Sequence, residues 1–284
     1  MDTIDLSSWL EFESKLRDLN RLREELVSKN ENRPFTVPLF RGVGNGQWGL
    51  TTTLERAYPM ESSDQLIGLP GYYRRVYASK AAIETATDRQ WDDMPEPPDF
   101  ATSLDGMSST APQHFFGRNM AVYRYFVYLR HHGFPSPLLD WTASPYVAAF
   151  FAFDSMAEGA EYVAVHAMVR DTLSSHSEGR PYVTVLGPYV RSHRRHLIQQ
   201  SQYTICLKWS PTYSFQSHDE AFQSGSELGF SGKLVKWRIP TRDRTLALKS
   251  LDLMNINGFS LFGSEDSLVR TIGRRELLFR DSGG

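Results

Sequence analysis

The chain has 284 residues, of which 40% are hydrophobic and 23% are charged. This composition supplies enough apolar material for a folded core and excludes disorder as a description of the whole chain. The 31 Lys and Arg against 33 Asp and Glu give a formal charge of −2, so the strong overall positive charge typical of duplex DNA-binding proteins is absent.

The apolar stretches and the N-terminus predict a cytoplasmic protein that does not associate with membranes. The longest apolar stretch, Tyr146–Phe153, is far shorter than the ~20 residues that span a bilayer. Asp2 and Asp5 lie where a signal peptide carries positive charge. Cys206 is the only cysteine, which excludes an internal disulfide and a multi-cysteine zinc site. We expect it to be a small buried residue of a strand.

The first 34 residues predict an amphipathic helix. Ser8 and Glu11 have the spacing of a capping box, and apolar residues then recur at helical intervals as far as Lys29. Pro34 follows this pattern and ends it. We therefore divide the chain into an N-terminal helix at 1–34 and a single domain at 35–284.

The next elements alternate between helices and loops. Residues 35–40 predict a short strand that delivers Arg41 and Gly42 at its end, and the Pro-rich segment 94–112 predicts a flexible loop. Apolar spacing predicts a helix at 118–130, and Ser144-Pro145 is typical of a helix N-cap and first position.

Strands dominate the second half of the chain. Alternating or β-branched segments predict strands at 162–169, 182–186, 203–209, 233–239 and 277–279. Because helices come mostly before them, the pattern favours an α+β fold with a mixed, mainly antiparallel sheet over a doubly wound fold.

Arg41 is the first candidate for a binding site. A guanidinium at the end of a strand, beside Gly42 and Gly44, can hold a phosphate or carboxylate through two parallel hydrogen bonds. The glycine spacing fits neither a dinucleotide-binding fingerprint nor a phosphate-binding P-loop. The alternative is that Arg41 pairs with a structural carboxylate.

Residues 130–145 form the second candidate, because titratable, aromatic and hydroxyl side chains gather there around two turns. The adjacent His131 and His132 lack the spacing of metal ligands, and we interpret them as histidines that interact with the dipole at a helix C-terminus. Asp140 is either functional or a cap for the backbone N–H groups of residues 142 and 143.

Several of these motifs resemble the FRG domain family, which is named after its Phe-Arg-Gly motif. They are Phe40-Arg41-Gly42, Trp48 with Leu50 and Arg56, the turn at 131–135, and the segment 138–145. The resemblance continues through Arg195, residues 199–203 and residues 260–263, so it covers the chain from about Phe40 to Arg270. Departures from the family pattern occur at Arg130, at 136–137 and at 264–267.

A weaker resemblance is to ADP-ribosyltransferases of the Arg-Ser-Glu type, because similar elements follow in the same order. These are 40–42, 142–144 with the helix after it, and 275–279. The resemblance implies an ADP-ribosyltransferase-like fold and NAD as the substrate. Cleavage of its nicotinamide–ribose bond passes through a cationic, oxocarbenium-like state, which needs a cation for the pyrophosphate, a positioning hydroxyl, an aromatic surface and a carboxylate.

The two resemblances give the expected site residues. The cofactor-binding residues are Arg41 for phosphate and Trp141 for stacking, together with Gly42, Arg56, His132 and Gln199. The catalytic residues are Glu276, Asp140, Thr142 and Ser144. The identity of the catalytic carboxylate stays open, because Asp140, Glu265 and Asp266 are alternatives to Glu276 and because glutamines stand at 199–202, where transferases carry a glutamate.

Three functions follow from these residues. The first is an NAD-dependent ADP-ribosyltransferase or NAD-cleaving enzyme, a bacterial or phage-linked toxin or phage-defence effector that modifies a protein or nucleic acid and that a regulatory or antitoxin partner controls. The alternative is a non-catalytic nucleotide- or nucleic-acid-binding module, which would use the basic segment Tyr189–His196 unless that segment is merely a solvated face. The third is a metal-dependent nuclease that uses Glu265, Asp266 and Asp140.

Overall fold

The computed structural model describes residues 1–29, 38–58, 68–105, 112–170, 180–187, 194–209, 212–223 and 232–280. The strands are β1 (Asp2–Asp5), β2 (Leu39–Val43), β3 (Leu139–Thr142), β4 (Tyr162–Arg170), β5 (Tyr182–Val185), β6 (Ser201–Trp209), β7 (Tyr213–Phe215) and β8 (Gly232–Pro240). The helices before β4 are α1 (Trp9–Lys29), α2 (Thr53–Ala57), α3 (Leu69–Ala78), α4 (Lys80–Thr87), α5 (Pro97–Asp105), α6 (Pro112–Arg118), α7 (Met120–His131) and α8 (Pro145–Asp154). Those after it are α9 (Arg194–Ile198), α10 (His218–Gln223), a 3₁₀ turn (Thr241–Asp243), α11 (Arg244–Leu253), α12 (Gly258–Phe262), α13 (Glu265–Arg274) and a π-helical turn (Arg275–Phe279).

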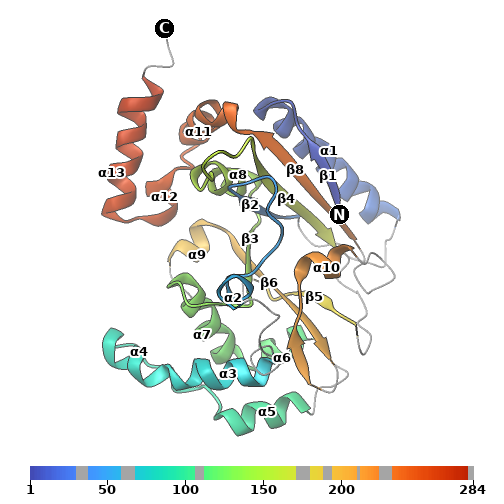
Figure 1. Cartoon of the computed structure of the whole chain (residues 1–284), viewed down its shortest axis with the longest axis vertical. Coiled ribbons are helices and arrows are strands. Elements are labelled where there is room, and N and C mark those ends of the chain that lie inside the picture. The colour runs from blue at the N-terminus through green and yellow to red at the C-terminus, as the bar shows by residue number, and fades with distance from the viewer. Residues whose placement is uncertain are drawn as a thin grey trace.

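The strands form one mixed sheet that runs the length of the molecule (Figure 1). Their order is β1-β8-β4-β2-β3-β6-β5, with β7 paired to β6. The β1–β8 pair is parallel, and the other described pairs are antiparallel. The predicted α+β fold with a mixed, mainly antiparallel sheet is therefore confirmed. Strand β1 was not predicted, because four residues beside a long helix carry little pattern of their own.

Strand β2 pairs very differently with its two neighbours. It pairs with β4 along its whole length, from Leu39 opposite Met168 to Val43 opposite Ala164. On its other side the register joins only Phe40 to Thr142 of β3. The sheet therefore opens between the C-terminal half of β2 and the N-terminal half of β3.

Two cores lie on the same face of the sheet, because the register carries Phe40, Thr142 and Ser201 across β2, β3 and β6 on one side. The upper core packs α1, α8 and α11 against β2, β4 and β8, and its large members include Trp9, Phe12, Phe40, Phe150, Phe153 and Trp237. The lower core packs α3, α5, α6 and α7 against β5, β6 and β7, and its large members include Tyr72, Tyr73, Phe100, Phe126, Tyr203 and Phe215. A smaller back core covers the opposite face with α10, and its members include Leu39, Trp141, Met168, Cys206 and Phe222.

Helix α8 lies very close to β2 because its small residues permit it. A Cβ added to Gly42 would lie 1.8 Å from the backbone oxygen of Ala148. Ser144 is the N-cap, and its hydroxyl accepts a hydrogen bond from the Val147 N–H at 3.3 Å. The predicted start of this helix is confirmed, and Gly42 serves the contact between strand and helix.

The N-terminal helix is confirmed with a changed cap. The Ser8 hydroxyl accepts from the Glu11 N–H at 3.2 Å, but the Glu11 carboxylate accepts from the backbone and hydroxyl of Ser7. Trp9 and Phe12 are buried in the upper core, so α1 packs directly onto the domain. Residues 30–34 lie outside the described residues.

Two predicted elements are wrong. The segment 94–112 contains helix α5, because Pro97 and Pro98 can occupy a first helical turn while Phe100 and Leu104 are buried one turn apart. Residues 106–111 of this segment lie outside the described part. The segment 277–279 is part of a π-helical turn that continues α13. Its three apolar residues suit a strand by type, but no strand lies beside them among the described residues.

The remaining strand predictions are confirmed within a few residues at β4, β5, β6 and β8. The strand predicted at 35–40 corresponds to β2, shifted toward its C-terminus, and residues 35–37 lie outside the described residues. Cys206 is buried in β6, as predicted. Among the described helices, none combines the length and apolarity needed to cross a bilayer.

Candidate functional site

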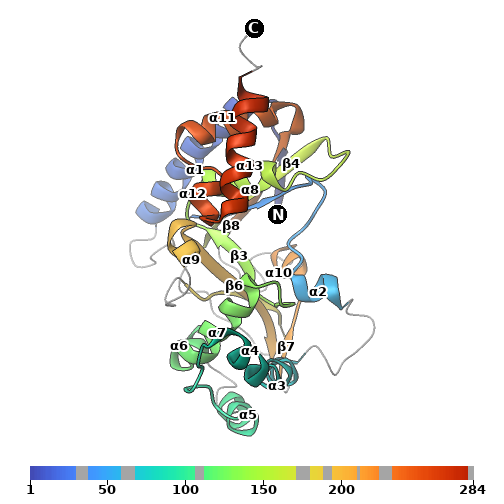
Figure 2. The same cartoon turned by 90° about the vertical axis from the view of Figure 1, so that its left-hand side faces the viewer.

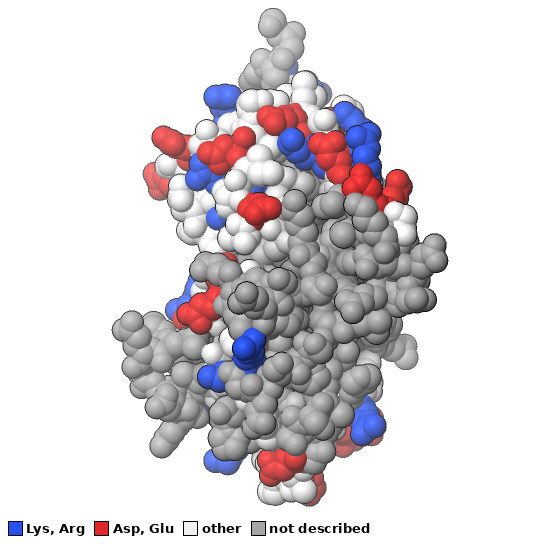
Figure 3. Space-filling model, turned by 90° about the vertical axis from the view of Figure 1, so that its right-hand side faces the viewer, with Lys and Arg blue, Asp and Glu red and all other residues white. Residues whose placement is uncertain are grey.

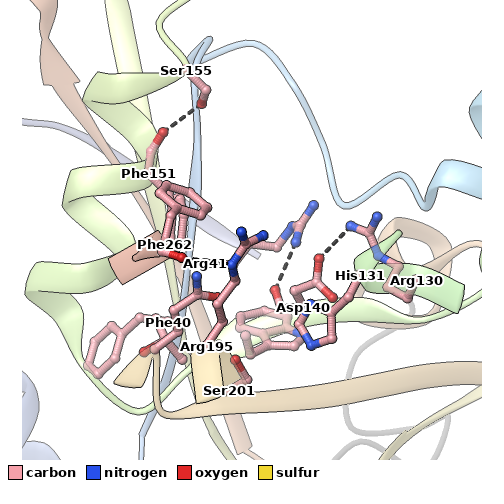
Figure 4. A pocket seen from close by; sticks show the side chains of 14 residues that line it. Phe40, Arg41, Arg130, His131, Asp140, Phe151, Ser155, Arg195, Ser201 and Phe262 are labelled. Carbon is pink, nitrogen blue, oxygen red and sulfur yellow. Dashed lines mark hydrogen bonds and ion pairs between the residues drawn. The ribbon is translucent and has the colours of Figure 1, made fainter. Parts of the chain in front are cut away.

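A cavity of about 320 Å³ lies on the face that carries both cores, where β2 and β3 separate. Figure 2 shows its surrounding elements, α7, β3, α9 and α12, on one side of the molecule. It is lined by Phe40, Arg41, Gly42, Arg130, His131, Asp140, Trp141, Thr142, Phe151, Ser155, Arg195, Gln199, Ser201 and Phe262 (Figure 4). Three guanidinium groups against one carboxylate leave two more positive than negative charges around this cavity.

Arg41 reaches the cavity through the opening in the sheet. Strand alternation places its Cβ on the same face as Leu39, yet its Nη1 donates to the backbone oxygen of Asp140 at 2.8 Å. Its Nε is buried and has no hydrogen-bond partner. Burial lowers the pKa of Arg41 to about 10, with Asp140 opposing this and Arg130 and Arg56 contributing to it. Arg41 is therefore a partly buried cation at neutral pH with capacity left for an anion.

Arg130 and Asp140 form an ion pair across the cavity. The Arg130 Nη2 donates to Asp140 Oδ2, and the two residues come from the end of α7 and from β3. Asp140 Oδ1 and Arg130 Nε are buried without hydrogen-bond partners. Because Asp140 lies in a strand and faces Arg130, the alternative of a turn cap is wrong. The N–H of Ser144 is bound instead by the Thr142 hydroxyl at 3.0 Å.

Helix α9 fastens α12 to the cavity and supplies the third arginine. Arg195 Nε donates to the backbone oxygen of Phe262 at 3.0 Å, and Gln199 Nε2 donates to that of Leu261 at 3.1 Å. The Arg195 guanidinium also lies 5.6 Å from the centre of the Phe262 ring. Phe262 packs edge-on against Phe151 of α8, with ring centres 5.9 Å apart. Two helices thus give the cavity an aromatic wall.

A second cavity of about 260 Å³ adjoins the first. Arg195 and Phe262 line both cavities. The other lining residues are Asp154, Gly258, Ser264, Asp266, Ser267, Arg270, Thr271 and Arg274. Arg274 pairs with Asp154, and both α12 and α13 begin at a capping box, so the wall of this cavity is well braced. Because they share Arg195 and Phe262, the two cavities adjoin, and we refer to them together as the elongated site.

Two histidines and a lysine lie close to Arg41. His166 lies opposite Arg41 in the β2–β4 register, and Lys236 lies opposite His166 in β8. Burial lowers the pKa of His166 to about 3, and Lys236 and Arg41 lower it further. Burial likewise lowers the pKa of His218 in α10 to about 3, with Arg41 contributing. Both imidazoles are therefore neutral at pH 7, which avoids two more positive charges beside Arg41.

The structure brings six of the ten predicted site residues to the cavity. They are Arg41, Gly42, Asp140, Trp141, Thr142 and Gln199. The residues that were missed, or given another role, lie at helix ends and on helix faces, and the main ones are Arg130, His131, Phe151, Arg195 and Phe262. Their contacts join segments far apart in the sequence. The family resemblance marked Arg130, His131, Arg195 and Phe262 as parts of motifs, but it gave none of them a place in the site.

The other four predicted site residues do not line the cavity. Glu276 is exposed on the π-helical turn and pairs with Arg280 at 2.6 Å. Arg56 is exposed, and its guanidinium donates to the backbone oxygen of Thr51 at 3.0 Å. Ser144 serves as the cap of α8. Because α7 continues through residue 131, His132 is exposed and packs on Tyr128, whereas His131 lines the cavity.

Trp141 does not present a stacking surface. Its side chain is 2% exposed, its ring belongs to the back core, and its indole N–H donates to the Thr204 hydroxyl at 2.9 Å. Strand alternation requires this, because Asp140 and Thr142 point to the opposite face. Phe151 and Phe262 are the aromatic residues that border the cavity.

The basic segment Tyr189–His196 is not a uniform solvated face. Residues 189–193 lie outside the described residues, Arg194 is exposed, Arg195 lines both cavities, and His196 is buried. On the face shown in Figure 3, described Lys and Arg side chains are interspersed with Asp and Glu. No group of three or more His, Cys, Asp or Glu in the described part of the chain is arranged to hold a metal ion.

The FRG domain family model matches residues 37–161. This range contains Arg41, Arg130, His131, Asp140 and Phe151, so the resemblance drawn from the Phe-Arg-Gly and 138–145 motifs is confirmed there. The resemblance of residues beyond 161, which include Arg195 and Phe262, stays a prediction. Neither the curated protein sequences nor the solved structures compared with the chain give a significant match.

Proposed function

We propose that this FRG domain protein binds NAD in the elongated site and is an NAD-dependent ADP-ribosyltransferase or NAD-cleaving enzyme. The observation that carries the proposal is the placement of Arg41, Arg130 and Arg195 around one cavity that shares Arg195 with a second, adjoining cavity. Such a site suits a ligand with a central anionic group between two heterocyclic arms. A dinucleotide with its pyrophosphate has this form.

The cavity dimensions support a ligand larger than a mononucleotide. The first cavity, at about 320 Å³, is close to the lower end of the roughly 300 to 1,000 Å³ typical of small-molecule sites. The second cavity adds about 260 Å³ of adjoining space. We place the pyrophosphate beside the arginines and the nicotinamide end in the first cavity, where Phe151 and Phe262 supply an aromatic wall.

In this proposal Asp140 and Thr142 act in the chemical step. When the nicotinamide–ribose bond breaks, the ribose becomes positively charged, and a nearby carboxylate stabilises that charge. Asp140 is the only carboxylate among the described residues that line the first cavity. Thr142 points to the same side of β3 as Asp140 and offers a hydroxyl for orientation of the ribose.

The acceptor in this proposal is a macromolecule, and the protein acts in the cytoplasm as a toxin or phage-defence effector under the control of a regulatory or antitoxin partner. This part of the proposal depends only on the family resemblance and on the weaker resemblance to ADP-ribosyltransferases. It is separate from the binding of NAD, which depends on the arginines.

A second candidate is a nucleotide-binding module without catalysis. One observation favours it: Asp140, the carboxylate of the first cavity, is already paired with Arg130. A paired carboxylate is less able to stabilise a cationic ribose than a free one. In this alternative the three arginines hold the phosphates and no bond is broken.

The test uses the full-length protein with NAD labelled on the adenylate, alone and in cell lysate. Calorimetry gives NAD affinity, and chromatography gives NAD loss and transfer of label to macromolecules. Arg41→Gln is expected to weaken NAD binding at least tenfold, on the order of one charge-assisted hydrogen bond. Arg275→Gln is the matched control, because Arg275 pairs with Asp252 outside both cavities.

Each result separates the candidates. NAD loss or label transfer that falls in Arg41→Gln and persists in Arg275→Gln supports the enzyme. NAD binding with neither product supports the binding module. If the wild type neither binds nor consumes NAD, the enzyme proposal is wrong, and a module that binds another nucleotide becomes the leading candidate.

A further inference from the structure

A chain of hydrogen bonds leads from the first cavity into the lower core. His131 lines the cavity, and its Nε2 lies 2.9 Å from the Tyr203 hydroxyl. The same hydroxyl lies 3.2 Å from Nδ1 of His196. The His196 ring is stacked on the Tyr203 ring, with centres 5.7 Å apart and planes 12° apart. Three side chains from α7, β6 and α9 thus form one connected polar path.

The inner part of this path is buried. Tyr203 is fully buried in the lower core, and His196 is 8% exposed. Buried polar groups are costly unless they are hydrogen-bonded to one another. Among the described residues, the only hydrogen bond of the His131 ring is that of Nε2, and Nδ1 is not among the fully buried atoms without partners. His131 therefore keeps one ring nitrogen accessible to water or a ligand.

The proton count of the path limits its arrangement. Tyr203 has one hydroxyl proton, so it donates to one imidazole and accepts from the other. If Tyr203 donates to His196, then Nε2–H of His131 donates to Tyr203. The bond at one ring nitrogen decides which tautomer a histidine adopts, and this arrangement leaves a lone pair on Nδ1 of His131. An imidazole lone pair beside the cavity is a proton acceptor.

We propose that His131 is the general base of the site and that Tyr203 and His196 form the path that carries the proton away. This assignment rests on the proposed function. It adds the group that takes the proton from the attacking water or acceptor hydroxyl, a role that Asp140 does not fill while it is paired with Arg130.

The bond between the ribose carbon and the nicotinamide nitrogen breaks, its electron pair stays on nitrogen, and neutral nicotinamide leaves. A bond forms between the ribose carbon and the oxygen of the nucleophile, whose proton moves to Nδ1 of His131. His131 then passes its Nε2 proton to the Tyr203 oxygen while Tyr203 passes its hydroxyl proton to His196. One proton is thereby delivered to His196.

The protonation states at neutral pH suit this role. Burial lowers the pKa of His131 below its usual 6.5, against the opposing effect of Asp140 in β3. His196 of α9 and Arg130 and His132 of α7 lower it further. Burial also raises the pKa of the Tyr203 hydroxyl far above its usual range, so Tyr203 keeps its proton. His131 is therefore neutral at pH 7 and can accept a proton. At acid pH it is already protonated and can no longer act as a base.

The test compares His131→Gln and Tyr203→Phe with Tyr123→Phe. Tyr123 is a matched control, because its hydroxyl also makes a buried hydrogen bond, to Gly187 at 2.6 Å, and lies outside the path. For each protein, calorimetry gives the NAD Kd, a discontinuous assay gives kcat for NAD loss, and kcat is measured across pH. In the wild type, nitrogen NMR of the imidazoles reports which ring nitrogen carries the proton.

We expect His131→Gln to lower kcat by roughly 100-fold, with Kd changed by less than about threefold, since a general base contributes to the chemical step. The fall of kcat in acid should disappear in this variant. Tyr203→Phe should lower kcat by roughly tenfold and move the acid limb, whereas Tyr123→Phe should stay within about twofold of the wild type. The wild-type spectrum should show His131 protonated at Nε2 and bare at Nδ1.

Two results would overturn the base assignment. One is a kcat in His131→Gln that matches the wild type, and the other is a proton on Nδ1 of His131 at pH 7, which the spectrum reports whether or not NAD is consumed. Failure of the proposed function gives a different result, because then the wild type itself shows no loss of NAD.

Discussion

The two sides of strand β2 show how one short strand serves both stability and a binding site. On the β4 side, which we term the closed side, all five residues of β2 are paired. On the β3 side, the open side, one residue is paired and a cavity follows. Both sides are built from Leu39–Val43.

The two sides of β2 differ in the groups that lie next to the strand. On the closed side, β4 and α8 surround the backbone, and Gly42 admits the close approach of α8. On the open side, the Arg41 guanidinium occupies the place where further β2–β3 pairing would continue, and it bonds to the Asp140 backbone oxygen. The Arg41 side chain thus takes the place of further backbone pairing between β2 and β3. This leaves backbone and side-chain groups of the two strands available to a ligand.

The largest expected effect is on the closed side. Gly42→Ala places a methyl group 1.8 Å from the Ala148 oxygen, so α8 or β2 must move. We expect the free energy of unfolding to fall by about 3 kcal/mol, the upper part of the range for overpacking. Gly273→Ala is the control, because nothing lies within 4 Å of a Cβ there, and it should raise stability by about 0.8 kcal/mol. Urea unfolding of both variants checks this, and equal effects would contradict the close packing.

The next effect is on the open side. Asp140→Asn keeps the shape of the side chain and the backbone bond to Arg41 but removes the carboxylate charge. Under the proposed function, kcat for NAD loss should fall by roughly 100-fold, the effect of removing one stabilising group from a transition state. NAD should bind equally well or up to about fivefold more tightly, because a negative charge near its phosphates is gone.

Asp5→Asn is the matched control for Asp140→Asn, because Asp5 also pairs with an arginine. That arginine is Arg238 on the neighbouring strand β8, and neither residue lines a cavity. It should leave both kcat and Kd within about twofold of the wild type. If Asp140→Asn instead weakens binding and leaves kcat unchanged, then Asp140 orients the arginines and is not the catalytic carboxylate.

A smaller effect on the closed side is expected in the pH dependence of stability. Because burial lowers the pKa of His166 to about 3, the unfolded chain takes up a proton at this histidine near its usual pKa of 6.5 while the folded chain does not. Stability is therefore unaffected above pH 6.5 and falls as the pH decreases from there toward 3. His166→Gln should reduce this dependence by about one proton. Urea unfolding at a series of pH values gives the slope, and an unchanged slope would contradict a buried neutral His166.

The smallest effect is expected at Glu276, which lies on neither side of β2. Its carboxylate is paired with Arg280 on an exposed turn outside both cavities. Glu276→Gln should leave kcat for NAD loss within about twofold of the wild type, because no contact joins it to the cavity. A loss of tenfold or more would restore Glu276 as the catalytic carboxylate.

The sequence predicted elements whose signals are local. The cap of α8 at Ser144 and Pro145 and the strands β4, β6 and β8 were found because capping and alternation act within a few residues. The family motif also led to Arg41 and Asp140, which meet in the cavity. The segment at 277–279 failed because three apolar residues suit either a strand or a helix until a neighbouring strand is present.

The cavity-lining residues that were missed have partners far away in the chain. His131 looked like a helix C-terminal histidine, and its contact with Tyr203 joins residues 72 positions apart. The sequence singled out His132, whereas His131 lines the cavity, and one position on a helix is a rotation of about 100°. A sequence pattern does not fix that rotation without the surface on which the helix packs.

The sequence by itself determined the fold class, most of the strands and the presence of a buried arginine motif, because hydrophobic periodicity and capping depend on near neighbours. Only the tertiary structure decided that β2 and β3 separate after one pair and that Arg41 meets Asp140, 99 positions away. Strand order and register arise from competition among packing partners distant in the chain, and a cavity exists where that competition leaves a gap.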